Sequence, residues 1–267
     1  MSADNHSFVL VRTDIPHCAR IWNYWTGGKD HYEIDRIVGD RCIEINPDIT
    51  TVAVQSRQFL IRAVRYLAAE QGVRQFLDIG CGLPSMLNTH EVAESVAPDA
   101  RVVYVDNDPL VLTHARALLH STTAEGVVAC IDSDFRDPER IIADAENVLN
   151  FREPIAVMFM GVLGLVEDYD EVRRIVDTLM KAAPSGSFLV MWHGTDDSRM
   201  YVDMCHAYAR HGGVPFTPRL RSEVEAVFDG LEMVEPGFVS ITQWHPHETE
   251  IGEVRPVSAY GGVARKP

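Results

Sequence analysis

Short apolar runs alternate with helical patterns through the middle of the chain. Each apolar run predicts a strand, and the runs lie at 74–80, 100–106, 126–132, 154–163 and 186–194. Between them apolar residues recur at helical spacing, which predicts helices at 89–97, 109–119, 138–149 and 169–183. Nearly continuous apolar strands that alternate with helices are typical of parallel sheets covered on both faces. The pattern therefore predicts an α/β fold with right-handed crossovers.

The regions on either side of this alternation carry weaker patterns. A helix is predicted from Thr50 to Glu70, whereas residues 1–47 are rich in turn residues and predict an irregular segment. After the alternation we expect helices around 198–211 and 219–228, then strands in "LEMVEPGFVSI" and "VSAYGGVAR" that form an antiparallel hairpin at the sheet edge. The prediction is a mostly parallel seven-stranded sheet with helices on both faces. An N-terminal segment, 1–47, would precede the main domain, 48–267.

Composition narrows the classes of function. The net charge is −15, and only three of the 24 basic residues are lysines, without a basic stripe, which argues against a nucleic-acid binder. No window approaches about 18 consecutive apolar residues, and the start of the chain does not resemble a signal peptide, so we expect no membrane association. The five cysteines show no C-x-x-C spacing, so we expect no disulfide and a cytoplasmic location.

The sharpest motif is "FLDIGCGLPS" at 76–85, which joins the first strand to a helix. Gly80 and Gly82 allow a tight turn and the close approach of a ligand, and a helix N-terminus presents free N–H groups. Asp78 ends the strand beside the glycines. Asp106 ends the next strand, where a carboxylate can accept hydrogen bonds from ribose hydroxyls. The alternative is a purely structural turn between a strand and a helix.

This D-x-G-x-G turn resembles that of the Rossmann-like S-adenosylmethionine (SAM) methyltransferases, whereas a dinucleotide site would need glycine or alanine where Ser85 stands. The resemblance implies that the glycines lie near the methionine part of SAM, and that Asp106 and Asn107 lie near the ribose. It also implies that Asp134 and Phe135, in "IDSDFRDP", hold the adenine edge. Helix capping and ordinary packing of Phe135 are the alternative.

Longer motifs resemble a narrower family. The stretches "ARIWNYWTGGKDHY", "RAVRYLAAEQGVRQFLDIGCGLP", "NTHEVA", "APDARVVYVDNDPLVLTHARALL" and "YGGVARKP" are similar to the bacterial SAM-dependent methyltransferase-like family designated DUF574. The resemblance covers essentially the whole chain. It implies a class I methyltransferase fold with an extra helical N-terminal segment, SAM as methyl donor and S-adenosylhomocysteine as product. Cys81 stands where the family often has threonine, and Trp22 to Thr26 depart from its usual Tyr-Asp-Tyr-Leu-Leu motif.

Aromatic and charged residues crowd the stretch "RIWNYWTGGKDHY" near the N-terminus. A cofactor at the carboxyl ends of the strands would face water unless a segment covered it, and methyl transfer gains from the exclusion of water. We therefore predict that residues 16–35 form a lid over SAM. Its cofactor-binding residues would be Arg20, Tyr24, Gly28 and Lys29, and Tyr32 would face the acceptor. Either Arg20 or Lys29 would pair with the cofactor carboxylate. A structural arm packed on the sheet edge is the alternative.

The acceptor site is predicted at the ends of the fourth and fifth strands. Met160 is expected to touch the cofactor, and Val162 and Leu163 the acceptor, whose apolar surroundings favour an apolar or aromatic molecule. His193 is the candidate general base and a further acceptor contact, with a purely structural histidine as the alternative. The histidines of "QWHPHE" lack a convincing third ligand, so we expect no metal site.

Together these features predict a SAM-dependent methyltransferase that acts on a small molecule, with specialised metabolism as its setting. A homodimer stays an open option. Two alternatives also stay open, because a fold does not fix a function. One is a SAM-fold enzyme with chemistry other than methyl transfer, and the other is a SAM-binding regulator without turnover.

Overall fold

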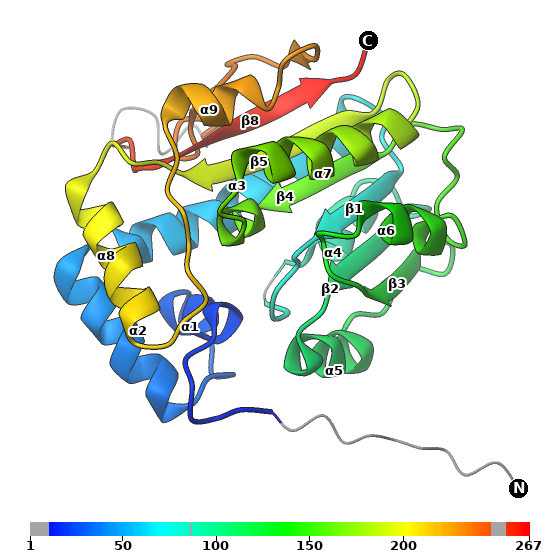
Figure 1. Cartoon of the computed structure of the whole chain (residues 1–267). Coiled ribbons are helices and arrows are strands. Elements are labelled where there is room, and N and C mark those ends of the chain that lie inside the picture. Colours follow the sequence, from blue (N-terminus) through cyan, green and yellow to red (C-terminus); the bar gives the residue numbers. More distant parts are fainter. Residues whose placement is uncertain (1–10, 86, 247–254) are drawn as a thin grey trace, which may run out of the picture.

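A computed structural model describes residues 11–85, 87–246 and 255–267. Within them a central sheet of eight strands has the order β3-β2-β1-β4-β5-β8-β6, and β7 also pairs with β8 (Figure 1). The strands are β1 (Gln75–Ile79), β2 (Arg101–Asp106), β3 (Val127–Asp132), β4 (Ala156–Met160), β5 (Phe188–Gly194), β6 (Glu232–Met233), β7 (Val239–Ser240) and β8 (Ala259–Arg265). The neighbours from β3 to β5 are parallel, and β8 is antiparallel to β5. The predicted α/β class with a mostly parallel sheet is confirmed.

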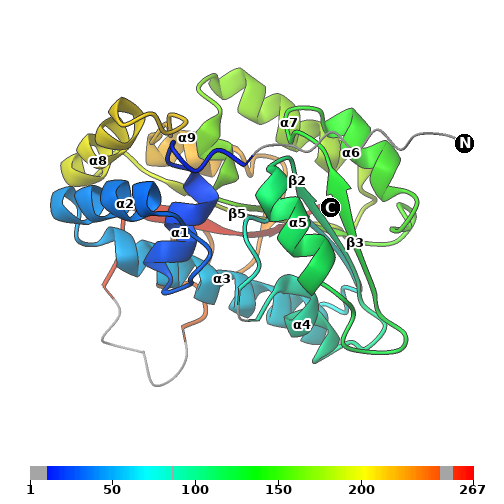
Figure 2. The ribbon, with the colours of Figure 1, turned by 90° about the horizontal axis from the view of Figure 1, so that it is seen from below.

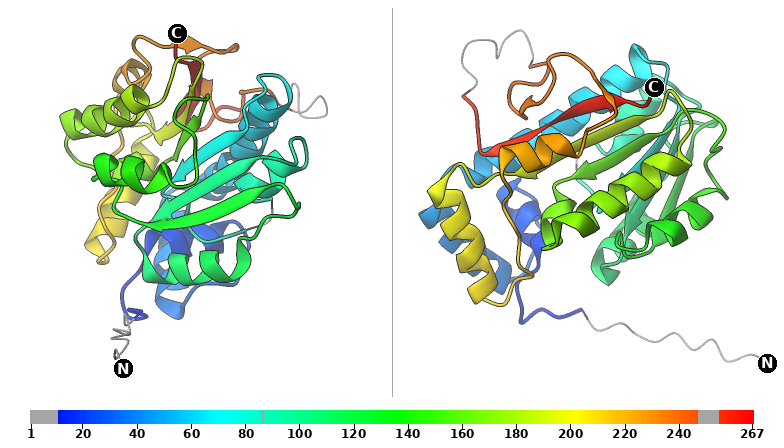
Figure 3. Two further views of the ribbon diagram at one scale, coloured as in Figure 1. Left: turned by 90° about the vertical axis from the view of Figure 1, so that its right-hand side faces the viewer. Right: turned by 45° about the horizontal axis from the view of Figure 1, so that its top comes forward.

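Helices cover both faces of this sheet (Figure 3). They are α1 (Cys18–Trp25), α2 (Glu33–Ile45), α3 (Ile49–Ala69), α4 (Thr89–Glu94), α5 (Pro109–Leu118), α6 (Pro138–Ala145), the short 3-10 helix η1 (Val162–Leu165), α7 (Tyr169–Ala182), α8 (Arg199–Arg210) and α9 (Arg221–Ala226). Successive strand residues point to opposite faces, so Phe76 packs with α1 to α4 and α8, whereas Leu77 packs with α6, α7 and α9. None of the described helices is long and apolar enough to cross a membrane.

The C-terminal part of the sheet differs from the seven strands that we predicted. The apolar run at 231–241 is interrupted by Pro236-Gly237, so it forms two short strands, β6 and β7, instead of one. Both pair antiparallel with β8, which lies between them and β5. The expected antiparallel pairing is present, and the break in the run adds the eighth strand.

The turn residues alone predicted an irregular N-terminal segment, and this was wrong, whereas the family resemblance implied a helical segment, which the structure confirms. Its described part, residues 11–47, contains α1 and α2. The apolar residues Ile34, Val38 and Cys42 recur every four positions in α2, so one face of this helix packs into the core. Figure 2 shows α1 with α2 and α8 on one side and α5 on the other. The helices of the N-terminal segment, α1 and α2, therefore lie near the carboxyl ends of the parallel strands.

Candidate active site

A cavity of about 660 Å³ opens at the carboxyl ends of β1, β2, β4 and β5. Its walls also include residues of α1, α3 and α8. This volume lies in the range of small-molecule sites, which run from about 300 to 1,000 Å³. The strand order reverses between β1 and β4, and ligands of open α/β sheets bind at such reversals. Fold and cavity thus place a candidate ligand site at the position that the glycine turn had indicated.

The glycine turn forms one wall of the cavity. Gly80 and Gly82 have positive φ angles of 70° and 66°, which favour glycine. A Cβ at Gly80 would lie 2.4 Å from Cγ2 of Val162, so no larger residue fits there. A Cβ at Gly82 would meet nothing within 4 Å, which leaves open space for a ligand against the backbone.

Asp106 joins the glycine turn to the loop after β2. Its Oδ2 accepts a hydrogen bond of 3.0 Å from the Gly82 N–H, and its Oδ1 accepts one of 3.0 Å from the Asp108 N–H. Burial raises the pKa of the Asp106 carboxyl. A carboxylate has about four lone-pair sites, so Asp106 can still accept hydrogen bonds from a ligand. Asp106 and Asn107 both line the cavity.

Asp78 lies at the end of β1 and also lines the cavity. Its Oδ2 accepts a 2.6 Å hydrogen bond from Oγ1 of Thr89, the first residue of α4. Burial raises the pKa of the Asp78 carboxyl, and the hydrogen bond from Thr89 opposes this shift. Asp78 therefore fixes the strand to the start of the helix and presents negative charge to the cavity.

Arg57, on α3, is a cavity residue that the sequence analysis missed. It makes no hydrogen bond or ion pair with any described residue, and burial lowers the pKa of its guanidinium, opposed by the nearby carboxyl of Asp78. An uncommitted cation in a cavity wall suits an anionic ligand group. The signal in the sequence was an arginine next to Ser56 on a largely apolar helix that packs on a sheet.

The loop after β3 contributes Phe135 to the cavity but not Asp134. Oδ1 of Asp134 accepts a 2.9 Å hydrogen bond from the Arg136 N–H, so the carboxylate stabilises the loop itself. The guanidinium of Arg136 lies over the Phe135 ring at 4.7 Å and donates a hydrogen bond to the Leu165 carbonyl. Of the two predicted adenine contacts, the structure brings only Phe135 to the site.

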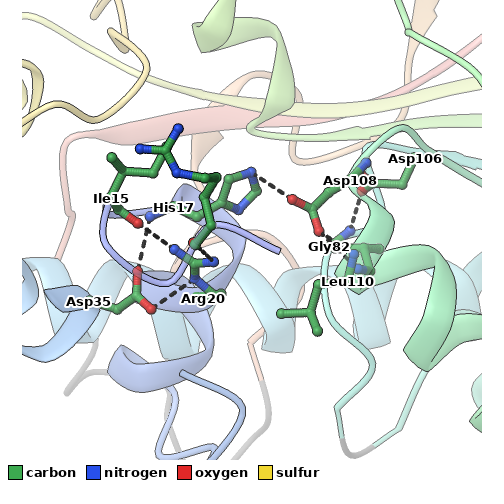
Figure 4. A network of polar contacts seen from close by, with 10 residues as sticks. Ile15, His17, Arg20, Asp35, Gly82, Asp106, Asp108 and Leu110 are labelled. Carbon is green, nitrogen blue, oxygen red and sulfur yellow. Dashed lines mark hydrogen bonds and ion pairs between the residues drawn. The ribbon is translucent and has the colours of Figure 1, made fainter. Parts of the chain in front are cut away.

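Arg20 does not reach the cavity, although we predicted that it binds the cofactor. Its Nε lies 2.8 Å from Oδ2 of the fully buried Asp35, and its terminal nitrogens donate to the carbonyls of Arg12 and Ile15 (Figure 4). The guanidinium is thus committed to holding the N-terminal segment together. Figure 4 also shows that His17 points across to Asp108, with Nε2 3.0 Å from Oδ2.

Only one of the other four residues that we predicted as ligand contacts in the N-terminal segment reaches the cavity. Gly28 lines the cavity, whereas Tyr24, Lys29 and Tyr32 do not. The Tyr24 hydroxyl donates a 2.6 Å hydrogen bond to Asp40 of α2, which does not line the cavity. Residues four apart share a helix face, so Tyr24 follows Arg20 away from the cavity, while Trp22 and Trp25 line it.

The predicted acceptor contacts divide in a similar way. Met160 and Val162 line the cavity, but Leu163 is fully buried in the core beside α7. His193 is 1% exposed and does not line the cavity, because alternation along β5 turns Trp192 toward it instead. His193 Nδ1 donates a 2.7 Å hydrogen bond to the Gly194 carbonyl, and burial lowers the pKa of the imidazole to about 4. The ring is therefore neutral near pH 7.

Two further histidines do not form a ligand site. His90 is buried, and its Nδ1 lies 2.8 Å from the hydroxyl of Tyr104. His245 Nε2 donates to the Glu235 carbonyl, while His247 and Glu248 of the same motif lie outside the described residues. The described part of the chain holds no group of three or more His, Cys, Asp or Glu residues that could bind a metal ion.

The cavity residues suit the expected cofactor. Gly82 leaves space against the backbone, Asp106 has free acceptor capacity, and Arg57 makes no hydrogen bond or ion pair with any described residue. These three features match a nucleoside diol and an amino-acid carboxylate in one molecule. The carboxyl groups of Asp78 and Asp106 also suit a ligand that carries a positive sulfonium centre.

Comparisons with known proteins agree with this geometry. A family model described as S-adenosyl methyltransferase matches residues 5–267. The crystal structure of a DUF574 family protein from Streptomyces avermitilis is 41% identical, with a TM-score of 0.90, over 96% of this chain and 99% of that one. A protein from Thermobifida fusca described as a methyltransferase is 37% identical, with a TM-score of 0.85, over 95% of this chain and 97% of that one.

More distant structures share the fold alone. Human N-acetylserotonin methyltransferase in complex with SAM is 14% identical, with a TM-score of 0.50, over 87% of this chain and 57% of that one. No curated protein matches the chain. The family-model match over residues 5–267 of the chain and the two similar crystal structures decide the assignment. The chain belongs to the S-adenosyl methyltransferase family, as a DUF574 protein with a Rossmann-like class I fold that uses SAM as its cofactor.

Proposed function

We propose that the protein transfers a methyl group from SAM to a small organic molecule that binds beside the cofactor in the same cavity. The observation that carries this proposal is that helices α1 and α8 cover the carboxyl ends of the strands. Residues of α1 and α8 line the cavity together with the glycine turn, so the ligand site lies between helices and sheet. Such a site suits a small acceptor better than a macromolecule, and a net charge of −15 disfavours nucleic acid.

The cavity residues would hold the cofactor as follows. Asp106 would accept hydrogen bonds from the ribose hydroxyls, with Asn107 beside it, and Phe135 would pack against the adenine. The turn from Gly80 to Gly82 would let the backbone approach the methionine part. Arg57 takes the role that we first gave to Arg20 or Lys29, and would pair with the cofactor carboxylate.

The N-terminal segment would act as the lid. Two contacts between its described part and the elements after β2 support this function. His17 Nε2 lies 3.0 Å from Asp108, and Oδ2 of Asp30 lies 4.0 Å from His114 on α5. Both pairs span the cavity edge, since His17, Asp30 and Asp108 line it. A segment held in this way excludes water from the reacting atoms.

The bound cofactor would supply an electrophilic methyl group on sulfur. The protein would orient the two reactants and exclude water from the reacting atoms. His193 as general base has no support from its location, because it faces the opposite side of β5 from Trp192 and does not line the cavity. Proximity and orientation alone can lower a barrier by several kcal/mol when two reactants are held in line. The protein would therefore act mainly by holding the acceptor against the methyl donor.

Incubation of the protein with methyl-labelled SAM and a broad panel of small acceptors tests the proposal. We expect S-adenosylhomocysteine and a labelled product with at least one acceptor, and Asp106→Ala should weaken SAM binding and turnover together. Tight SAM binding without S-adenosylhomocysteine across the panel would instead favour a regulator without turnover. A product other than a methylated acceptor would favour different chemistry on the same fold.

The biological setting is part of the same proposal. We infer a cytoplasmic enzyme of specialised metabolism, and we keep a homodimer as one assembly to test beside the monomer. Light scattering on the purified protein measures its mass against the 29.9 kDa of one chain. A mass of one chain at working concentration would contradict the dimer without affecting the proposed reaction.

A further inference from the structure

Aromatic side chains fill the half of the cavity that lies away from the glycine turn. This half, called the aromatic compartment below, is lined by Trp22, Trp25, Trp192, Tyr201, Tyr208 and Phe216. We infer that the aromatic compartment binds the methyl acceptor, and that this acceptor is a neutral, planar aromatic molecule that carries a hydrogen-bond acceptor atom. The inference rests on the proposed function and adds the chemical class of the substrate.

Ring geometry favours a flat ligand. The rings of Trp22 and Trp192 are stacked, with centroids 5.8 Å apart and planes 23° apart, and Trp25 meets Trp22 edge-on at 5.6 Å. Stacked and edge-on aromatic pairs present flat faces and edges that another ring can extend. Trp192 also lies over the end of β4, because a Cβ on Gly161 would be 2.6 Å from its Cζ2. Trp192 therefore marks the boundary between the aromatic compartment and the cofactor half of the cavity.

Charge favours a neutral ligand. The cavity residues on α1, α2, α8 and β5 include no Asp, Glu, Lys, Arg or His. The Asp, Arg and His residues that line the cavity in the described chain belong to the cofactor half and its rim: His17, Asp30, Arg57, Asp78, Asp106, Asp108 and Arg136.

The thiols and phenols of the compartment are uncharged as well. Burial raises the pKa of Cys18 to about 12 and that of Cys205 to about 12, and it raises the pKa values of Tyr201 and Tyr208. A charged acceptor would lose its hydration here without gaining an opposite charge. A neutral molecule meets no such penalty.

Two buried polar atoms of the aromatic compartment lack hydrogen-bond partners in the described part of the chain, and they are the reason why we expect the ligand to carry a hydrogen-bond acceptor atom. Trp192 Nε1 and the Tyr208 hydroxyl make no hydrogen bond with any described residue, and the two side chains are 1% and 8% exposed as whole residues. Unpaired buried polar groups are uncommon and destabilising, so a ligand that pairs them gains affinity. An indole N–H can only donate, so the partner atom must be an acceptor such as a carbonyl, an ether oxygen or a ring nitrogen.

Titration of three probes into protein saturated with S-adenosylhomocysteine tests the inference. Coumarin is neutral, planar and has acceptor oxygens; naphthalene has similar rings without them; and coumarin-3-carboxylate adds a charge. Calorimetry should give the tightest binding for coumarin, with a loss of about 5-fold for naphthalene, as expected for one missing hydrogen bond. The carboxylate should bind at least as weakly as naphthalene. Equal binding of coumarin and its carboxylate would overturn the inference.

Variants locate the binding. Tyr208→Phe removes only the hydroxyl and should weaken coumarin but not naphthalene, whereas Trp22→Ala should weaken both. Tyr66→Phe, on α3 away from the cavity, is the matched control and should change neither. Unchanged coumarin affinity in Tyr208→Phe and Trp22→Ala would place the probe elsewhere and refute the assignment.

The affinity for S-adenosylhomocysteine separates this inference from the proposed function. If S-adenosylhomocysteine binds and no probe does, the aromatic compartment is wrongly assigned while the methyltransferase proposal stands. If S-adenosylhomocysteine fails to bind, the proposed function falls, and the probe titrations on the free protein still decide whether the compartment accepts aromatic molecules.

Discussion

Single side chains decide which residues of each element reach the cavity. Along β5 Trp192 faces the cavity and His193 faces the opposite side, although both are almost fully buried. All seven residues of this strand are buried, so its sequence shows no alternation that would reveal the two faces. Prediction from the sequence therefore found the strand and its ligand edge, but chose the wrong neighbour of the pair as the cavity residue.

Arg57 offers a test of the cofactor site at this scale. Arg57→Ala should weaken SAM binding about 10- to 100-fold, because a hydrogen bond to a charged group contributes roughly 1.5 to 3 kcal/mol. Methylthioadenosine lacks the amino-acid part, so its affinity should stay unchanged. Calorimetry measures both, and Arg65→Ala, exposed on the same helix, is the control. Equal losses for the two ligands would show that Arg57 does not bind the carboxylate.

His193 should make stability depend on pH. Its pKa is about 4 in the folded protein and about 6.5 when unfolded, so between these values the unfolded chain binds a proton that the folded chain does not. The free energy of unfolding should therefore fall as pH drops from about 6.5 to 4, by up to roughly 3 kcal/mol from this residue.

Urea denaturation at pH 7, 6 and 5 checks the His193 prediction. His193→Asn keeps an N–H donor but does not titrate, so its stability should fall less steeply with acid than that of the unsubstituted protein. His206→Asn, at an exposed position of α8, should keep the original slope. Parallel curves for all three proteins would contradict the prediction.

At the scale of elements, the sequence correctly predicted the helices and strands whose apolar residues keep one spacing throughout. The helices at α3 and α5 are confirmed, and Asp108 caps α5 by accepting hydrogen bonds from the N–H groups of Leu110 and Val111. The pattern failed where turn residues and helical spacing overlap, in α1 and α2. It also failed in the run 154–163, where Gly161 has a positive φ of 84° and leads the chain out of β4 into η1.

The His17–Asp108 pair should control the mobility of α1. His17→Asn removes the partly buried contact between the imidazole and the Asp108 carboxylate, which we expect to be worth about 1 kcal/mol, so SAM affinity should fall about 5-fold. Hydrogen exchange at the amides of α1 should also become faster. His114→Asn, whose Nδ1 lies 4.0 Å from Asp30, should have a smaller effect on both measurements. Unchanged exchange in His17→Asn would show that the pair does not hold the segment.

At the scale of the whole molecule, the sheet depends on pairing between distant parts of the chain. β8 comes last in the sequence, yet it lies between β5 and the short strands β6 and β7. Its seven residues pair in register with all seven residues of β5, including Gly261 opposite Trp192. The sequence could predict that β8 is a strand, but not its neighbours, because pairing of this kind depends on contacts far apart in the chain.

Deletion of residues 259–267 should therefore abolish cooperative folding. The loss removes β8 and leaves the buried strand β5 as an open apolar edge, which favours aggregation. Thermal melts followed by circular dichroism, together with solubility, measure the effect. Deletion of Pro267 alone is the control and should melt like the full chain. A cooperative melt in the longer deletion would contradict this account.

The position of β8 also bears on how the protein is made. A ribosome releases β1 to β5 well before β8, so a nascent chain exposes one side of β5 until residues 259–265 have emerged. Trp192 lies on that strand, and the wall of the active site that it forms is therefore finished last. A chain terminated before residue 259 would carry the entire glycine turn and yet lack β8 beside β5, so we expect catalytic competence to appear only after β8 has been made.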